Sequence, residues 1–230
     1  MFKLNDKILI IAAHPDDEVI GCGGTILKAL KSGCSVSVIF LGEGVSTRYV
    51  GYELSKKSLE AQRIRQKESI NSLKILRVKD YEFGSLLCTR FDTYPLVEIV
   101  RIIEKKIKKL KPNIIFTNNP YELNIDHTVT YNATEIATRP FNKSFIRSIY
   151  SYEIVCSGNF PFSQNFQPNV YVDVKKFWKQ KILAFAAYKN EIRKYPFPRS
   201  LNGIEIQARY RGLQSGLELS EAFKLEKSFY

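Results

Sequence analysis

The pattern of hydrophobic and polar positions divides the first third of the chain into strand and helix candidates. Residues 7–13 (KILIIAA) form a continuous apolar run, which is typical of a parallel strand buried on both faces of a sheet. A predicted helix follows and stops at Gly33, and residues 35–41 (SVSVIFL) predict a second strand. Residues 54–76 are a long charged stretch of helical character, and residues 81–83 are a short candidate strand.

An amphipathic helix is the clearest periodic feature in the middle of the chain. Asp92 and Thr93 supply N-cap chemistry, and Pro95 suits the first turn of the helix. The apolar positions recur at helical spacing over Leu96, Ile99, Val100, Ile103, Ile107 and Leu110. Pro112 ends this helix, and residues 113–117 (NIIFT) predict another buried strand.

The remaining elements continue the alternation. We predict helices over residues 128–138, 177–189 and 201–213, and strands over residues 149–155 and 170–174. Strands that alternate with helices favour an α/β fold with a mostly parallel sheet and right-handed crossovers. Because no repeat or linker divides the sequence, we expect one domain over residues 1–230. Residues 1–140 would form its core, and residues 141–230 would complete the sheet and its crevice.

The composition fits a globular protein. With 44% hydrophobic residues the chain can bury a sizeable core, and no segment reaches the roughly 18 apolar residues of a membrane span. Residues 1–6 lead directly into the first strand and leave no room for a signal peptide. The four cysteines (Cys22, Cys34, Cys88 and Cys156) form no CxxC pair, so we expect reduced thiols and a cytoplasmic location.

The formal net charge of +12 at pH 7 indicates an acidic partner in general terms. Nucleic acid, an anionic membrane surface or a phosphate-bearing substrate would each suit this charge. We expect no nucleic-acid partner, because the basic run over residues 105–109 (KKIKK) lies on the polar side of a regular helix and no recognition motif accompanies it. Residues 141–230 contain fourteen Lys and Arg against seven Asp and Glu, which favours an anionic substrate and leaves peripheral membrane contact open.

Both histidines of the chain stand beside aspartates. His14 lies in residues 13–18 (AHPDDE), directly after the first strand, and His127 ends residues 124–127 (NIDH), just before a predicted helix. Imidazole nitrogens and carboxylate oxygens are the ligands that zinc and similar divalent ions take. Ligands of open α/β sheets bind beyond the carboxyl ends of the strands, so both motifs would meet in one crevice if their strands are neighbours.

These residues predict a metal-dependent hydrolase. His14, Asp17 and His127 would leave one coordination position for water, as catalytic zinc sites do. Zinc lowers the pKa of such a water to about 7, and Asp16 is placed to accept its proton as a general base. Asp126 could orient His127 through a hydrogen bond. The alternative is structural: Asp16 or Asp17 would cap the following helix, and His127 would be a satisfied polar residue.

Glycines follow the first of these motifs. Residues 21–24 (GCGG) lack the GxGxxG spacing of a dinucleotide-binding loop and come after carboxylates that would repel a pyrophosphate. We therefore expect the glycines to let the first helix approach the sheet or the site closely.

Several motifs resemble the PIG-L/LmbE zinc deacetylases. Residues 13–18, followed by residues 21–25 (GCGGT), are similar to the first metal motif of this family. Residues 124–127 resemble the second metal motif of one bacterial branch, and residues 195–200 (YPFPRS) and 221–223 (EAF) resemble the end of that branch. The likeness therefore runs over nearly the whole chain.

The resemblance implies a Rossmann-like fold of three α/β/α layers that removes an acyl group, usually acetyl, from the nitrogen of an amino sugar. It assigns the metal to His14, Asp17 and His127 and the general base to Asp16. An arginine after the second strand commonly contacts the sugar in this family, and Arg48 is the matching candidate, with an ordinary surface arginine as the alternative. The metal would be Zn²⁺, although a site of two histidines and one aspartate also accepts Fe²⁺ or Co²⁺.

The chain departs from the family pattern at four positions. Asn124 stands where many members carry a histidine that stabilises the oxyanion, and its amide N–H could still donate a hydrogen bond. Phe197 stands where the branch often has histidine, and Glu43 and Cys88 stand where aspartate is common. We expect an amino-sugar substrate, free or linked to a nucleotide or a lipid, and the sequence leaves the oligomeric state open. The alternatives are a catalytically silent relative that binds metal and sugar, or a basic nucleic-acid binder with a structural metal.

Overall fold

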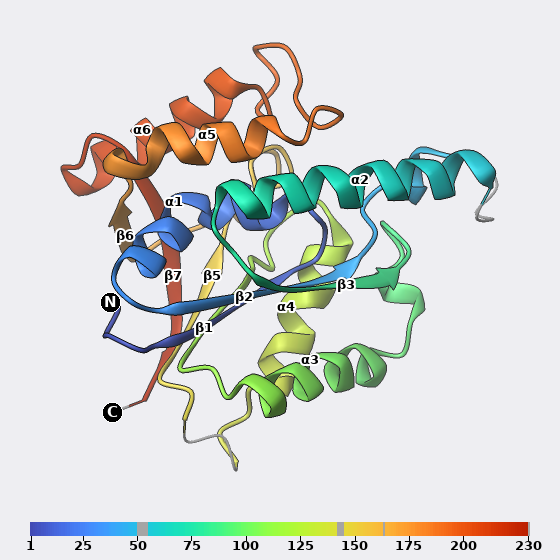
Figure 1. The fold of residues 1–230 in the computed structure, drawn as a ribbon, viewed down its shortest axis with the longest axis horizontal. Coiled ribbons are helices and arrows are strands. Elements are labelled where there is room, and N and C mark those ends of the chain that lie inside the picture. The colour runs from blue at the N-terminus through green and yellow to red at the C-terminus, as the bar shows by residue number, and fades with distance from the viewer. Residues whose placement is uncertain (50–54, 142–144, 163, 230) are drawn as a thin grey trace.

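The structure is a computed structural model that describes residues 1–49, 55–141, 145–162 and 164–229. Within these residues, seven strands form one sheet in the order β3-β2-β1-β4-β5-β7-β6, with helices on both faces (Figure 1). Five neighbouring strands run parallel: β1 (Lys7–Ala12), β2 (Ser35–Gly42), β3 (Asp80–Leu86), β4 (Ile114–Asn118) and β5 (Ser148–Tyr152). The prediction of a single α/β domain with a mostly parallel sheet is therefore confirmed.

Helices cover the two faces of the sheet unequally. One face carries α1 (Asp17–Lys31), α2 (Lys56–Ile75), α5 (Trp178–Ala186) and α6 (Leu201–Ser215), and the other carries α3 (Leu96–Leu110) and α4 (Ile125–Ala137) (Figure 1). Ile8 and Ile10 of β1 pack into the hydrophobic cluster on the first face, and Leu9 and Ile11 pack into the cluster on the second. The two-residue period of a strand thus explains why the whole run is apolar.

The predicted apolar stripe of α3 faces the core, and Ile103 is fully buried. The predicted N-cap is wrong, because the N-cap position belongs to Pro95, which makes no side-chain cap hydrogen bond. Asp92 and Thr93 lie in a separate 3₁₀ turn before it. The residue before a proline is pushed towards extended backbone, so Tyr94, at φ −92° and ψ 144°, separates that turn from the helix.

The C-terminal part of the chain adds a mixed edge to the sheet. β7 (Ser220–Ser228) pairs antiparallel with β5 and with β6 (Val170–Asp173). β7 is not predicted by its sequence, because charged residues occupy its partly exposed positions and mask the apolar alternation around Phe223.

The glycines after the first metal motif permit close packing of α1, as expected. A Cβ atom added at Gly24 would lie 2.6 Å from Cβ of Val174.

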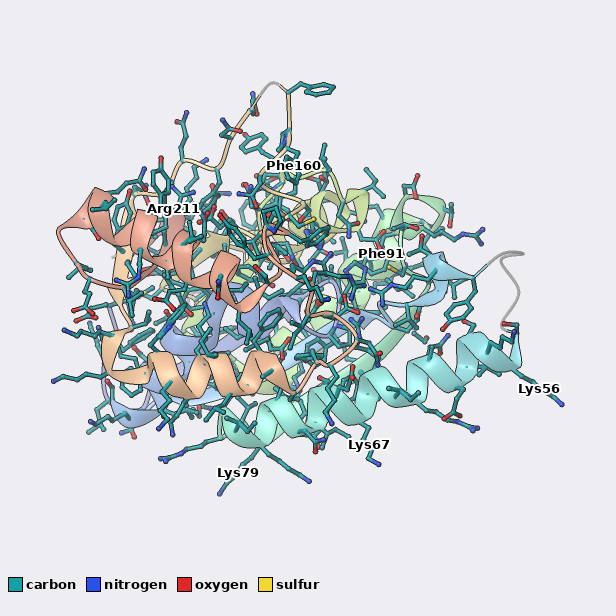
Figure 2. The ribbon with its side chains drawn as sticks, turned by 90° about the horizontal axis from the view of Figure 1, so that it is seen from above. Lys56, Lys67, Lys79, Phe91, Phe160 and Arg211 are labelled. Atoms are coloured by element: carbon teal, nitrogen blue, oxygen red, sulfur yellow. The ribbon has the colours of Figure 1, made fainter. Side chains whose placement is uncertain are left out.

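The charged helix α2 lies on the outside of the same layer. Figure 2 shows Lys56, Lys67 and Lys79 pointing away from the body of the protein, which accounts for part of the basic charge as solvated surface. None of the helices in the described ranges is both long and apolar enough for a membrane span.

Neighbouring strands bring the two histidine motifs together. β1 pairs in parallel with β4, with Leu9 opposite Ile115, so the carboxyl ends of the two strands lie side by side. Asn124 caps α4 by accepting a hydrogen bond at Oδ1 from the backbone N–H of Asp126, 3.1 Å away. The helix therefore starts at Ile125 and includes His127 in its first turn, which corrects the expectation that His127 would precede the helix.

Candidate metal centre and active-site cavity

Three buried side chains converge beyond the ends of β1 and β4. One ligand atom from each of His14, Asp17 and His127 lies within 4.8 Å of the others. Nδ1 of His14 is 4.0 Å from Oδ2 of Asp17, and Nε2 of His127 is 3.6 Å from the same oxygen. The structure thus brings together the residues that the sequence selected as metal ligands, in the tight cluster that a single divalent ion requires.

The remaining ring nitrogens of both histidines contact carboxylates. Nε2 of His14 lies 2.8 Å from Oδ2 of Asp126, and Nδ1 of His127 bonds to Oε2 of Glu122. Such carboxylate partners fix the orientation of metal-binding imidazoles and leave the opposite nitrogen for the ion. The expectation that Asp126 orients His127 is therefore wrong. Asp126 points back towards β1 and orients His14, and Glu122 holds His127.

Backbone and amide donors fix the position of Asp17. Its Oδ2 accepts hydrogen bonds from the backbone N–H of His14 at 3.0 Å and from Nδ2 of Asn118 at 3.1 Å. Oδ1 of Asn118 in turn accepts the backbone N–H of Ala13 at 3.0 Å. Asn118, the last residue of β4, therefore ties the end of β1 to the carboxylate that would bind the metal.

The electrostatics of the cluster suit a cation. Burial lowers the pKa of His14, but Cys88 and Asp126 outweigh it and hold that pKa well above its ordinary value. The pKa of His127 is raised as well, because Asp17 and Glu122 outweigh the effect of burial. The raised pKa values of both histidines mean that the acidic groups around them favour positive charge between the two imidazole rings. The donor set and its potential therefore fit a divalent metal ion.

A second group of candidate ligands overlaps with the first. His14, Cys88 and Asp126 also bring one ligand atom each within 4.8 Å of one another. However, Asp126 already accepts the backbone N–H groups of Thr89 at 2.5 Å and Phe91 at 2.9 Å, besides the contact with His14. These bonds use its carboxylate for positioning, so the first group is the better metal site.

Asp16 lies beside the ligands in strained backbone. Its φ of 129° is unusual for a residue with a side chain, and such strain concentrates at functional sites. Asp16 occupies the N-cap position of α1 without a side-chain cap hydrogen bond, which is against the structural alternative for this residue. Burial raises the pKa of Asp16 to about 6, although the guanidinium groups of Arg65 and Arg199 oppose the rise. This value suits a group that exchanges protons near neutral pH.

An arginine network surrounds Asp16. Nη1 of Arg65 lies 3.6 Å and Nη1 of Arg199 lies 3.3 Å from Oδ2 of Asp16. Both arginines also pair with Glu191, and so does Arg48, whose Nη1 is 2.7 Å from Oε1 of Glu191. Glu191 therefore holds three guanidinium groups along one wall of the site.

These residues line one cavity of about 250 Å³ that also exposes the predicted metal ligands. The structure places Arg48 and Asn124, the other predicted site residues, in the same lining. Oδ1 of Asn124 is occupied by its cap hydrogen bond, so the Nδ2 group is the part of the amide left to act as a donor.

Four charged residues of the site were not predicted from the sequence. Arg199 lies in the YPFPRS motif and could have been selected from it. Glu122 lies five positions before His127, but a lone acidic residue gave no signal. Arg65 and Glu191 stand among many exposed charges in the sequence, and only their burial, at 2% exposure each, distinguishes them.

Comparison with known protein families gives a match over more than half of the chain. A sequence profile described as "PIG-L: GlcNAc-PI de-N-acetylase" matches residues 9–138, which include the three candidate ligands and Asp16. The chain belongs to the PIG-L family. The resemblance found in its motifs is thereby confirmed.

This PIG-L protein is similar to two named relatives over most of its length. The diacetylchitobiose deacetylase of Thermococcus kodakarensis is 28% identical over 244 residues, which cover 97% of this chain and 86% of the relative. A Bacillus anthracis protein named "Probable N-acetyl-alpha-D-glucosaminyl L-malate deacetylase 2" is 28% identical over 194 residues, with 82% and 83% coverage. The solved N,N'-diacetylchitobiose deacetylase from Pyrococcus horikoshii has a TM-score of 0.77 at 23% identity, with 96% and 83% coverage. This last likeness shows a shared fold.

Proposed function

We propose that this PIG-L protein is a zinc-dependent hydrolase that removes an N-acyl group, in the first place acetyl, from an amino sugar or sugar conjugate. The observation that carries the proposal is the buried His14, Asp17 and His127 cluster beside Asp16 in one cavity. The names of the two relatives, both deacetylases of N-acetylated sugars, support the substrate class.

Nδ1 of His14, the carboxylate of Asp17 and Nε2 of His127 would hold the metal, because their other ring nitrogens are engaged by Asp126 and Glu122. A zinc ion bound there polarises a carbonyl group and lowers the pKa of water to about 7. Fe²⁺ or Co²⁺ could replace zinc on this donor set.

Asp16 would move the proton. Its carboxylate would accept a proton from the attacking water as the new C–O bond forms at the amide carbon. The same carboxyl would then give the proton to the sugar nitrogen as the C–N bond breaks, so that acetic acid and a free amine leave. Arg65 and Arg199 support this role because they hold the carboxylate at the edge of the metal cluster.

Two further residues would act on the substrate. Nδ2 of Asn124 would donate a hydrogen bond to the carbonyl oxygen as negative charge develops there. Arg48 would bind the sugar, because its side chain is 38% exposed at the cavity while Glu191 fixes its position.

The three arginines that pair with Glu191, here called the arginine wall, affect which group the substrate sugar would be linked to. Three guanidinium groups, from Arg48, Arg65 and Arg199, meet two carboxylates, from Glu191 and Asp16, which leaves a net charge of one positive unit. A sugar linked to a nucleotide or a lipid diphosphate would match this wall better than a neutral sugar. Equal kcat/KM for neutral and diphosphate-linked sugars at low salt would contradict this choice of carrier.

The test combines metal analysis with an assay of amine release. The purified protein should contain one zinc per chain and release amine from N-acetylglucosamine compounds, free, nucleotide-linked or lipid-linked. A chelator should abolish the release, and added zinc should restore it. Stoichiometric metal without amine release from any of these compounds would overturn the enzyme and leave a metal-binding relative that is catalytically silent.

A further inference from the structure

A second and larger cavity, of about 410 Å³, lies outside the candidate active site. Its walls come from α6, from the start of β6 and from the segment that follows β5. Neither the metal ligands nor Asp16 reach it. Arg211 of α6, which lines this cavity, is labelled in Figure 2.

Aromatic rings and carboxamides dominate its lining. Phe166, Tyr171 and Tyr210 supply aromatic surface, and Asn159, Asn165, Gln167, Gln207 and Gln214 supply amides. An aromatic side chain presents an apolar face together with, in tyrosine, a polar group at its edge. Each carboxamide offers both a donor and an acceptor, as each hydroxyl of a sugar does. The lining therefore matches the alternating C–H and O–H surface of a saccharide.

The charged groups of this cavity neutralise each other. Nε and Nη2 of Arg211 donate to the two carboxylate oxygens of Glu153, at 2.7 and 2.6 Å. The guanidinium carbon also lies 5.6 Å from the ring centre of Phe166 and 5.3 Å from that of Tyr210. Arg211 is the one cationic side chain among the described residues that line this cavity, and Glu153 already neutralises it. An anionic ligand would therefore meet no free positive charge, so a neutral polar ligand fits better.

Part of the polar lining is available for a ligand. Among the described residues, no hydrogen bond or ion pair engages the side chain of Asn165 or Gln167, and both side chains are exposed. Asn159 uses Oδ1 to accept the backbone N–H of Cys156, at 2.7 Å, which leaves its Nδ2 group as a donor. These three amides can bond to hydroxyl groups without breaking a contact of the fold.

The two cavities share one short segment of chain. Ile154 and Ser157 line the candidate active site, whereas Glu153, Gly158 and Asn159 line the second cavity. The segment forms a tight turn, in which the backbone N–H of Gly158 donates to the carbonyl of Ile154 at 2.9 Å. One turn of backbone thus separates the two spaces, so a ligand of two or more sugar units could occupy both.

We infer that this second cavity is a saccharide subsite, which binds a neutral sugar unit attached to the amino sugar that reacts in the first cavity. The inference rests on the proposed function for the identity of the reacting unit. It adds a preference for oligosaccharides over single sugars, with Asn165 and Tyr210 as binding residues.

The test compares two double variants in the metal-loaded protein. Asn165→Ala/Tyr210→Ala removes one amide and one aromatic ring from the subsite. Gln164→Ala/Arg209→Ala is the matched control, because each residue precedes its counterpart in the same segment and lines neither cavity. N-acetylglucosamine and its β-1,4-linked trimer are the probes.

Binding is measured by isothermal titration calorimetry in an Asp16→Asn background, so that turnover does not interfere, and KM and kcat are measured with Asp16 intact. We expect the subsite variant to raise Kd and KM for the trimer roughly tenfold and to leave kcat and the monosaccharide unchanged. The control should match the parent protein. Because binding is read without turnover, failure of the proposed hydrolysis would show as bound trimer without amine release.

Two results would overturn the inference. The first is a Kd for the trimer that is the same in the subsite variant, the control and the parent protein. Absence of any trimer binding by the parent protein would count in the same way. The other is a change of oligomeric state in the subsite variant, seen by sedimentation, without any change in saccharide binding. That result would assign the cavity to a contact between copies of the chain.

Discussion

Nη1 of Arg199 lies 3.3 Å from Oδ2 of Asp16, although 183 residues separate them in sequence. The contact joins the segment after α5 to the turn after β1, and the same guanidinium also lies 3.1 Å from Oε2 of Glu191. Arg199 therefore acts on Asp16 from outside the residues matched by the family profile, and it holds the proposed general base against the metal cluster.

Removal of this contact should slow catalysis without loss of metal. We expect Arg199→Gln to lower kcat by about tenfold and to change KM less, since Asp16 loses a partner that fixes its carboxylate. Arg193→Gln is the control, because Arg193 is exposed and bonds only to nearby backbone oxygens in the described structure. An Arg199→Gln variant with full kcat, or one with reduced metal content, would contradict the positioning role.

The roles of the first metal motif should separate by substitution. Asp16→Ala should keep one metal per chain and lose about 10²–10⁴-fold in amine release, because a general base contributes of that order. His127→Ala should lose both metal and activity. Metal content by mass spectrometry and amine release are measured on the same preparations. Equal loss of metal in both variants would contradict this division.

Glu122 should tune the metal affinity through His127. Glu122→Gln keeps the size of the side chain but replaces the carboxylate that engages Nδ1 of His127. Loss of such a partner typically weakens metal binding by about 10–100-fold, and we expect a shift of this size in a competition assay with a zinc chelator. Glu60→Gln, on the exposed face of α2, is the control and should leave the Kd for zinc unchanged. An unchanged Kd in Glu122→Gln would remove Glu122 from the site.

Close packing between α1 and the residue after β6 should be sensitive to one methyl group. Gly24→Ala places a Cβ atom 2.6 Å from Cβ of Val174, and overpacking of this kind costs about 1–3 kcal/mol in the free energy of unfolding. Urea denaturation measures the loss. The double variant Gly24→Ala/Val174→Gly removes both valine atoms that the new methyl group would meet, Cβ and Cγ1, so its loss should be smaller than the sum of the two single losses. Additive losses would show that the clash does not occur.

The ion pair between Asp6 and Arg147 should make stability depend on pH in the acidic range. Hydrogen bonds from Arg147, at 2.9 and 2.7 Å, hold the pKa of Asp6 below its ordinary value of 3.8. A lowered folded-state pKa stabilises the protein above the ordinary value, and this stabilisation disappears as the pH falls through the folded-state pKa. We expect it to be on the order of 1 kcal/mol, because the pair is partly solvated.

The variant Asp6→Asn tests this pair. Its free energy of unfolding at pH 7 should be lower than that of the parent, and the difference should shrink below pH 3.8. A difference that stays constant through the acidic range would assign the loss to packing rather than to the charge of Asp6.

Local patterns predicted much of the fold. The two errors at helix starts, at Pro95 and at Ile125, have local causes, whereas the failure to predict β7 has a cause in a distant part of the chain. The continuous apolar runs predicted β1, β2 and β4, because strands buried on both faces need apolar residues at every position. β7 was not predicted, because its partners, β5 and β6, bury residues that its own charged sequence does not mark as buried.

The same division holds in the site. The sequence by itself determined the candidate ligands His14, Asp17 and His127 and the neighbouring Asp16, because few residue types bind zinc and the chain has only two histidines. Only the tertiary structure decided that Asp126 holds His14 and that Glu122 holds His127. It also decided that Arg199 contacts both Asp16 and Glu191. The physical reason is that a ligand type is a property of one side chain. A hydrogen-bond partner is instead set by which strands lie side by side, and no local pattern in the sequence states that order.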